Sequence, residues 1–210
     1  MHIYAYGSVC RGDVLPTSDV DLLALVDDAD VRLDPAVFSI YRYSQLKREW
    51  CEGNPFSWHL ALESRLVFSE DRTDFIAKLG RPSEYRNWQS DSQKFREIYG
   101  VAKDALATRC DTTTFELSTL YLAIRNFAIC FSLHAGSRPV FSRRSFEQLG
   151  VDSLDIDSSA TRIMEDARIL STRGVGSEAS DDDVAHVLSQ LPKVDRWMSD
   201  LVIKGSGEDD

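Results

Sequence analysis

Two predicted strands joined by a glycine-containing segment define the beginning of the chain. The first, His2–Tyr6, runs directly into Gly7-Ser8, and the second, Val20–Val26, is mostly apolar with acidic residues at its front. A mostly apolar run of this length is typical of a strand that is buried in a sheet. The chain therefore begins as a mixed α/β unit with a tight turn after the first strand and an acidic pair on the second.

The turn after the first strand has residue types that bind anions. Gly7 allows the backbone to turn sharply and bring N–H groups close to a negative charge, and the Ser8 hydroxyl adds a donor. A helix that begins here would favour phosphate at its N-terminus, and Arg11 would add a fixed positive charge. Residues 7–12 are therefore predicted to bind phosphate.

Two carboxylates follow on the second strand. Asp19 and Asp21 are two residues apart, so the period of a strand places both side chains on one face, roughly 6.5–7 Å apart along the backbone. Mg²⁺ prefers one or two carboxylates together with substrate phosphates. A carboxylate pair beside a phosphate-binding turn is typical of metal-assisted nucleotidyl transfer, and a tight turn followed by a solvated acidic pair is the alternative.

This segment resembles the nucleotidyltransferases of the DNA polymerase β superfamily, in particular the minimal nucleotidyltransferase branch. The residues that match their signature in type and spacing are Gly7, Ser8, Arg11, Gly12, Ser18, Asp19, Asp21 and Leu22. The resemblance implies that nucleotide is bound by Gly7, Ser8, Arg11 and Ser18. It also implies that Asp19 and Asp21 are catalytic and bind Mg²⁺ or Mn²⁺, with a nucleoside triphosphate as substrate.

The rest of the chain predicts an α+β fold. Strands at Val37–Tyr43 and Leu66–Phe68 would complete a small mixed sheet, and from about residue 72 onward helices follow one another. The expected parts are a polymerase-β-like nucleotidyltransferase domain at residues 1–72, a helical bundle at 73–205 and a disordered tail at 206–210. This order of domains is similar to that of kanamycin nucleotidyltransferase.

Apolar periodicity and capping residues predict seven helices. They span Ser44–Cys51, Pro55–Glu63 after an Asn54 cap, Ser83–Ala107, Thr113–Ala135, Phe141–Leu149, Ser159–Ser171 and Asp183–Ile203. Thr113 and Glu116 have the spacing of a capping box. Arg125 and Asn126 interrupt the longest apolar stretch, so its helix is expected in the core of the bundle rather than in a membrane.

One acid that the resemblance implies is missing. Active relatives carry a third carboxylate on the next strand, close to twenty residues beyond the second aspartate, but Val37–Tyr43 contains no acid. Glu63 is the best local substitute and a candidate catalytic residue, with His59 one turn earlier on the same helix face. A buried polar pair that braces the helix is the alternative. Glu116 is a candidate by analogy with kanamycin-type enzymes, although capping explains it more simply.

Basic residues in the helical part also allow two interpretations. Arg125 would either pair with an acid in the bundle or contact a substrate or triphosphate. Around Phe141, Arg138, Arg143 and Arg144 form the most basic local patch, either as a solvated loop or as a contact for phosphate or RNA.

Composition limits the remaining function classes. The net charge of −10 argues against general binding to DNA or RNA, which requires a cationic face. Most of this charge lies in residues 151–210, which carry 14 acidic and 6 basic side chains. The four cysteines are scattered without zinc or redox spacing, and no signal peptide is recognised, so we expect a cytoplasmic protein.

These features predict an enzyme that transfers a nucleoside monophosphate, most often AMP in this branch, to an acceptor hydroxyl. The acceptor would be a small molecule, a protein or an RNA end, and a homodimer is one assembly to consider. The alternative is a catalytically impaired protein of the same fold, serving as a nucleotide-binding or antitoxin-like regulatory module.

Overall fold

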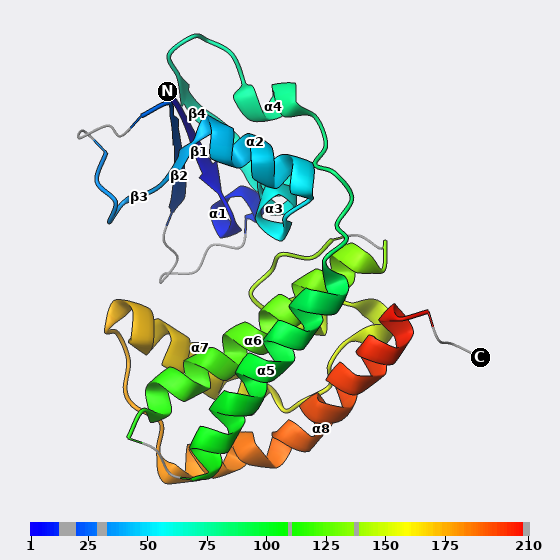
Figure 1. Ribbon diagram of the computed structural model, residues 1–210. Coiled ribbons are helices and arrows are strands. Elements are labelled where there is room, and N and C mark those ends of the chain that lie inside the picture. Colours follow the sequence, from blue (N-terminus) through cyan, green and yellow to red (C-terminus); the bar gives the residue numbers. More distant parts are fainter. Residues whose placement is uncertain (13–19, 29–32, 109–110, 137–138, 208–210) are drawn as a thin grey trace. The chain divides into compact units, whose positions relative to one another are not determined.

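Figure 1 shows the computed structural model of the protein. The structure describes residues 1–12, 20–28, 33–108, 111–136 and 139–207. The chain divides into two compact units, Met1–Arg86 and Asn87–Asp210. The compact units therefore divide after residue 86, and the domain boundary at residue 72 stays a prediction.

A small mixed sheet organises the first unit. Its described strands are β1 (His2–Tyr6), β2 (Asp21–Val26), β3 (Phe38–Arg42) and β4 (Ser64–Ser69). Their order is β3-β2-β1-β4, with β1 antiparallel to both neighbours and β2 parallel to β3. The predicted mixed sheet is confirmed.

Helices cover one face of this sheet (Figure 1). They are α2 (Tyr43–Glu52), α3 (Pro55–Glu63) and α4 (Phe75–Leu79), while the short α1 (Ser8–Arg11) follows β1. The buried cluster beneath them contains Tyr4, Leu23, Leu25, Leu46, Trp50, Leu60 and Ile76. Burial of each such side chain contributes about 1.5–3 kcal/mol. Because alternate residues of a strand share a face, Asp21 lies on the same covered face as Leu23 and Leu25.

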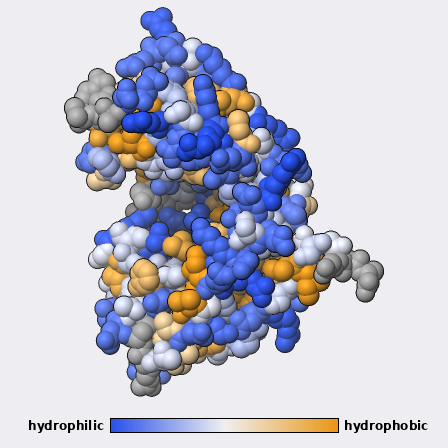
Figure 2. Space-filling view, in the orientation of Figure 1, coloured by the Kyte–Doolittle hydropathy of each residue, from blue (hydrophilic) through white to orange (hydrophobic). Residues whose placement is uncertain are grey.

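The outward face of α2 is polar, as expected for a helix packed on a sheet. Lys47, Arg48 and Glu52 are exposed, whereas Leu46 and Trp50 are buried. Figure 2 shows that hydrophilic residues dominate the visible face of the first unit.

The predicted beginning of α3 is confirmed. The Asn54 side chain accepts a hydrogen bond from the Phe56 backbone N–H at 2.8 Å, and Pro55 occupies the first helical turn. This cap satisfies one of the free donors at the helix start, and the fixed φ of proline suits that position. The cap fixes where α3 begins, and the helix ends at Glu63 beside the site.

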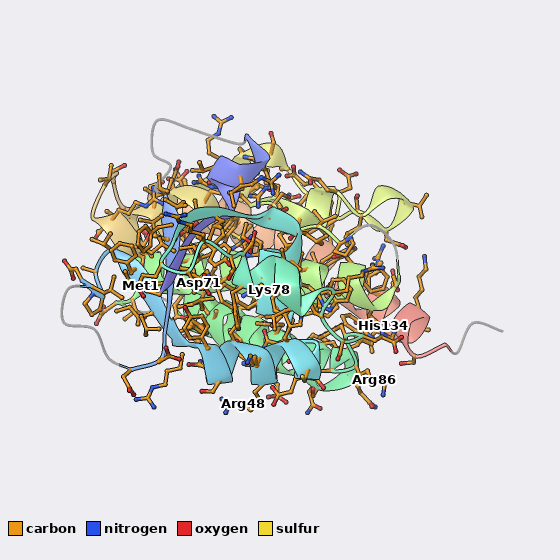
Figure 3. All side chains as sticks on the ribbon, turned by 90° about the horizontal axis from the view of Figure 1, so that it is seen from above. Met1, Arg48, Asp71, Lys78, Arg86 and His134 are labelled. Atoms are coloured by element: carbon orange, nitrogen blue, oxygen red, sulfur yellow. The ribbon has the colours of Figure 1, made fainter. Side chains whose placement is uncertain are left out.

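Contacts at the beginning of β1 fix the strand that leads into the site. The Met1 α-amino group lies 2.6 Å from Glu70 Oε2, and His2 Nε2 lies 3.3 Å from Asp71 Oδ1. Met1 and Asp71 lie side by side in Figure 3. The other end of β1 runs directly into Gly7.

The second unit is helical. Its described helices are α5 (Trp88–Ala107), α6 (Thr113–His134), α7 (Ser158–Arg173) and α8 (Asp181–Gly205), with 3₁₀ turns η1 (Ser145–Glu147) and η2 (Gly150–Asp152). The central helix α6 packs against α5, α7 and α8, and its residues Leu120, Ile124 and Phe127 are fully buried. The predicted helical region is confirmed, so the chain has an α+β fold. None of the described helices combines the length and apolar character needed to cross a membrane.

The cap of α6 differs from the predicted one. The N-cap residue is Thr112, not Thr113, and no side-chain hydrogen bond caps the helix. Instead, Thr112 Oγ1 donates to Glu116 Oε1 at 3.1 Å. The sequence motif was therefore displaced by one residue, and Glu116 is engaged by the neighbouring threonine.

The predicted helix at Phe141–Leu149 is wrong, since only Ser145–Glu147 forms a short 3₁₀ turn there. Side chains of α6 take up the backbone carbonyl groups of this segment. Tyr121 donates to one of them and Arg125 to two. Carbonyl groups held in this way are directed toward α6 instead of forming the i→i−4 bonds of a helix.

Candidate active site

The Gly-Ser turn has a backbone conformation that requires glycine. Gly7 has φ 78° and ψ −142°, and the four-residue helix α1 follows it at once. Residues with a Cβ rarely adopt a φ of this sign. Ser8 is buried, and the Cys10 N–H donates to the Gly7 carbonyl at 3.0 Å. The turn is therefore a compact loop.

Asp21 faces this turn directly. Tyr6, the residue before Gly7, pairs with Asp21 across the β1–β2 ladder. A Cβ added at Gly7 would lie 2.9 Å from Asp21 Oδ2 and 4.0 Å from His59 Cε1. The glycine turn, the Asp21 carboxylate and the His59 ring therefore converge on one small space.

The end of α3 closes the site with an ionic cluster. The Glu63 carboxylate forms an ion pair with Arg11 and lies 3.0 Å from His59 Nε2. The Glu63 backbone carbonyl also accepts from the Gly7 N–H at 3.2 Å. The three side chains are only 14–17% exposed. Burial alone would raise the pKa of Glu63, but hydrogen bonds from His59 and Arg11 outweigh it and hold this pKa below its ordinary value of 4.5.

Replacing Glu63 by glutamine tests the stabilising role of this cluster. Because the Glu63 pKa is lower in the folded protein, its ionised form stabilises the fold at neutral pH, and this contribution disappears as pH falls below 4.5 and on through the folded pKa. We expect Glu63→Gln to lower the free energy of unfolding at pH 7 by roughly 1–3 kcal/mol. Urea unfolding of both proteins across pH 3–7 measures this. A difference that stayed constant with pH would contradict the assignment.

The described strand β3 presents no acid on the sheet face that it shares with Asp21. Ser39 pairs with Leu23, so it lies on that face, and its Oγ lies 3.2 Å from Tyr6 Oη. The sequence interpretation did not single out Ser39 or Tyr6. Strand pairing was needed to find both residues.

Two residues of the predicted motif, Ser18 and Asp19, lie outside the described residues. Among those that are described, no group of three or more His, Cys, Asp or Glu side chains is arranged to hold a metal. Asp21 Oδ2, a hard oxygen ligand of the kind that divalent cations prefer, lies directly beside the Gly7 turn.

The predicted basic residues of the second unit have mixed surroundings. Arg125 donates to the carbonyl groups of Ser142 and Phe141, at 3.2 and 3.3 Å. Arg144 forms a two-point ion pair with Glu165, with contacts of 2.6 and 3.1 Å. Arg138 lies outside the described residues.

A mixed sheet whose first strand ends in a glycine turn facing an aspartate on the next strand is consistent with a polymerase-β-like nucleotidyltransferase. Residues 2–95 match the family described as the nucleotidyltransferase domain. Residues 2–95 are therefore similar to nucleotidyltransferase domains, and this family supports transfer of a nucleoside monophosphate as the general chemistry. No curated protein matches the chain.

Proposed function

We propose that the protein transfers AMP from ATP to an acceptor hydroxyl, with Mg²⁺ or Mn²⁺ as cofactor. The observation that carries this proposal is the convergence of Asp21 Oδ2 on the Gly7 turn, within a nucleotidyltransferase domain. A carboxylate beside a phosphate-binding turn suits a metal-bound triphosphate.

Each residue of the turn has a proposed role in holding the triphosphate. Gly7 offers close backbone approach, Ser8 and Ser18 offer polar contacts, and Arg11 offers a guanidinium that matches phosphate geometry. Asp19 and Asp21 would hold the metal. When bound, the metal would stabilise the charge that develops on the transferred phosphoryl group.

Glu63 is the acid proposed to contact the reacting hydroxyl, because the described β3 has none. Its lowered pKa keeps the carboxylate ionised at neutral pH, as a hydrogen-bond acceptor requires. If Glu63 acts at this step, Glu63→Gln lowers kcat with little change in the KM for ATP. If it only positions Arg11, the same variant chiefly raises that KM.

Incubation with Mg²⁺ and each α-labelled nucleoside triphosphate, alone and with cell extract, tests the proposal. We expect label transfer and pyrophosphate release that are greatest with ATP and absent in an Asp19→Asn, Asp21→Asn double variant. Nucleotide binding without either product would defeat the enzymatic proposal. Labelled products separated into small molecules, protein and RNA would identify the acceptor class.

One observation favours a second candidate function. Ser39 occupies the face of β3 on which active relatives are expected to carry an acid. A protein with this site would still bind nucleotide and would serve as a nucleotide-binding or antitoxin-like regulatory module. Saturable ATP binding without turnover, lost in the double aspartate variant, is the expected result for that function.

A further inference from the structure

Tyr121 of α6 is the centre of a group of arginines in the second unit. Its ring is 4% exposed, and its hydroxyl donates to the Arg143 carbonyl at 2.9 Å. Burial raises the pKa of Tyr121 to about 12, and the neighbouring Glu165 adds to this effect. Tyr121 is therefore a neutral donor within a polar region between α6 and α7, which lie side by side (Figure 1).

Four guanidinium groups interact electrostatically with Tyr121 from three segments of the chain. They belong to Arg125, Arg143, Arg144 and Arg168, here named the α6–α7 arginine cluster. Arg144 forms ion pairs with Glu165 and, at 3.7 Å, with Glu147.

Arg168, on α7, is the member of the cluster that is half-buried without an acidic partner among the described residues. Burial, opposed by Tyr121 and reinforced by Arg173, lowers the pKa of the Arg168 guanidinium. Removing a charge from water without an opposite partner is unfavourable, and an arginine with a purely structural role would more commonly be paired.

Two buried hydroxyl groups on the same segments lack hydrogen-bond partners within the described part of the chain, which is consistent with a bound polar ligand. They belong to Ser142, which is 7% exposed, and Thr161, which is fully buried. Ser142 belongs to the segment whose carbonyl groups bind Arg125, and Thr161 lies two turns before Arg168 on α7. Buried hydroxyl groups usually have partners.

We infer that the α6–α7 arginine cluster binds the terminal phosphate of a small phosphorylated molecule. Guanidinium groups form two-point, charge-assisted hydrogen bonds with phosphate oxygens, and a phosphate would supply the anion that Arg168 lacks. A compact phosphate group suits a few arginines converging on one tyrosine, whereas an extended nucleic acid would require a long cationic face. Phosphate binding at this cluster does not depend on the proposed nucleotidyl transfer.

Titration of the full chain with inorganic phosphate tests the site directly. In ¹H–¹⁵N spectra of arginine side chains, we expect saturable shifts of the Arg168 and Arg144 Nε–Hε signals. The signal of Arg162, an exposed arginine on the same helix, should stay in place. Shifts that fail to saturate, or that affect Arg162 equally, would overturn the inference.

Substitution on α7 provides the second measurement. Arg168→Gln should weaken phosphate binding at the cluster by about tenfold or more, whereas the control Arg162→Gln should leave it unchanged. Arg168→Met should lose binding while keeping or raising Tm, because it removes a half-buried charge. A large fall in Tm with binding retained in Arg168→Gln would show a structural role instead.

Different variants test nucleotidyl transfer and phosphate binding, so either proposal can fail without the other. The Asp19→Asn, Asp21→Asn variant should lose nucleotidyl transfer but keep phosphate binding at the α6–α7 arginine cluster. Arg168→Gln should weaken phosphate binding at the cluster but keep ATP binding. Phosphate binding that disappeared with the two aspartates would contradict a separate site.

Discussion

Asp21→Asn is expected to slow nucleotidyl transfer by about 10³-fold while the protein stays folded. The substitution keeps the shape of the side chain but removes its charge beside the Gly7 turn. Loss of one preorganised group that stabilises transition-state charge costs on the order of 10²–10³ in rate, and a metal-binding carboxylate acts on that charge through the cation. Single-turnover kinetics with α-labelled ATP measures the effect.

A control for Asp21→Asn is available just beyond the same strand. Asp28 follows the C-terminal end of β2 and is exposed, so Asp28→Asn makes the same change in net charge away from the turn. We expect its transfer rate to match that of the parent protein. Equal rates in Asp21→Asn and the parent would remove Asp21 from the catalytic site.

Gly7→Ala is expected to abolish measurable ATP binding and to lower stability. The substitution places a methyl group 2.9 Å from Asp21 Oδ2, in the turn proposed to hold the triphosphate. It also forces alanine to adopt φ 78°, at a cost on the order of 1–3 kcal/mol. Calorimetric titration with ATP and thermal unfolding separate the two effects.

Gly80 offers a matched control for the backbone effect. It has φ 70° and ψ −147°, close to the values of Gly7, but a Cβ there would meet nothing within 4 Å. Gly80→Ala should therefore lower Tm by a similar backbone cost and leave ATP affinity unchanged. If Gly7→Ala weakened ATP binding no more than Gly80→Ala, the turn would have no direct role in holding nucleotide.

Local signals made much of the first unit predictable from sequence. Alternation and turn residues located β1, β2 and β3 within one or two residues, and Asn54-Pro55 marked the start of α3. These features depend on neighbours within a few positions. The motif residues Gly7 and Asp21 were also predictable as a pair, because a short connection brings the two strands together.

Contacts between distant residues were not predictable in the same way. Arg11 and Glu63 are 52 positions apart, and only the pairing of β1 with β4 and the length of α3 bring them together. The segment after α6 was predicted as a helix, but Tyr121 and Arg125 bind its carbonyl groups from outside. Tertiary hydrogen bonds override local propensity at such positions.

The last residue of α3 holds the Gly-Ser turn through both its backbone and its side chain. Leu60 lies one turn earlier on the same helix. It is fully buried in the cluster between α3 and the sheet, and it is not one of the proposed nucleotide contacts. If the turn holds nucleotide as proposed, a substitution at Leu60 would therefore also change nucleotide affinity. Selection therefore could not change the packing of α3 without also changing the affinity of the turn.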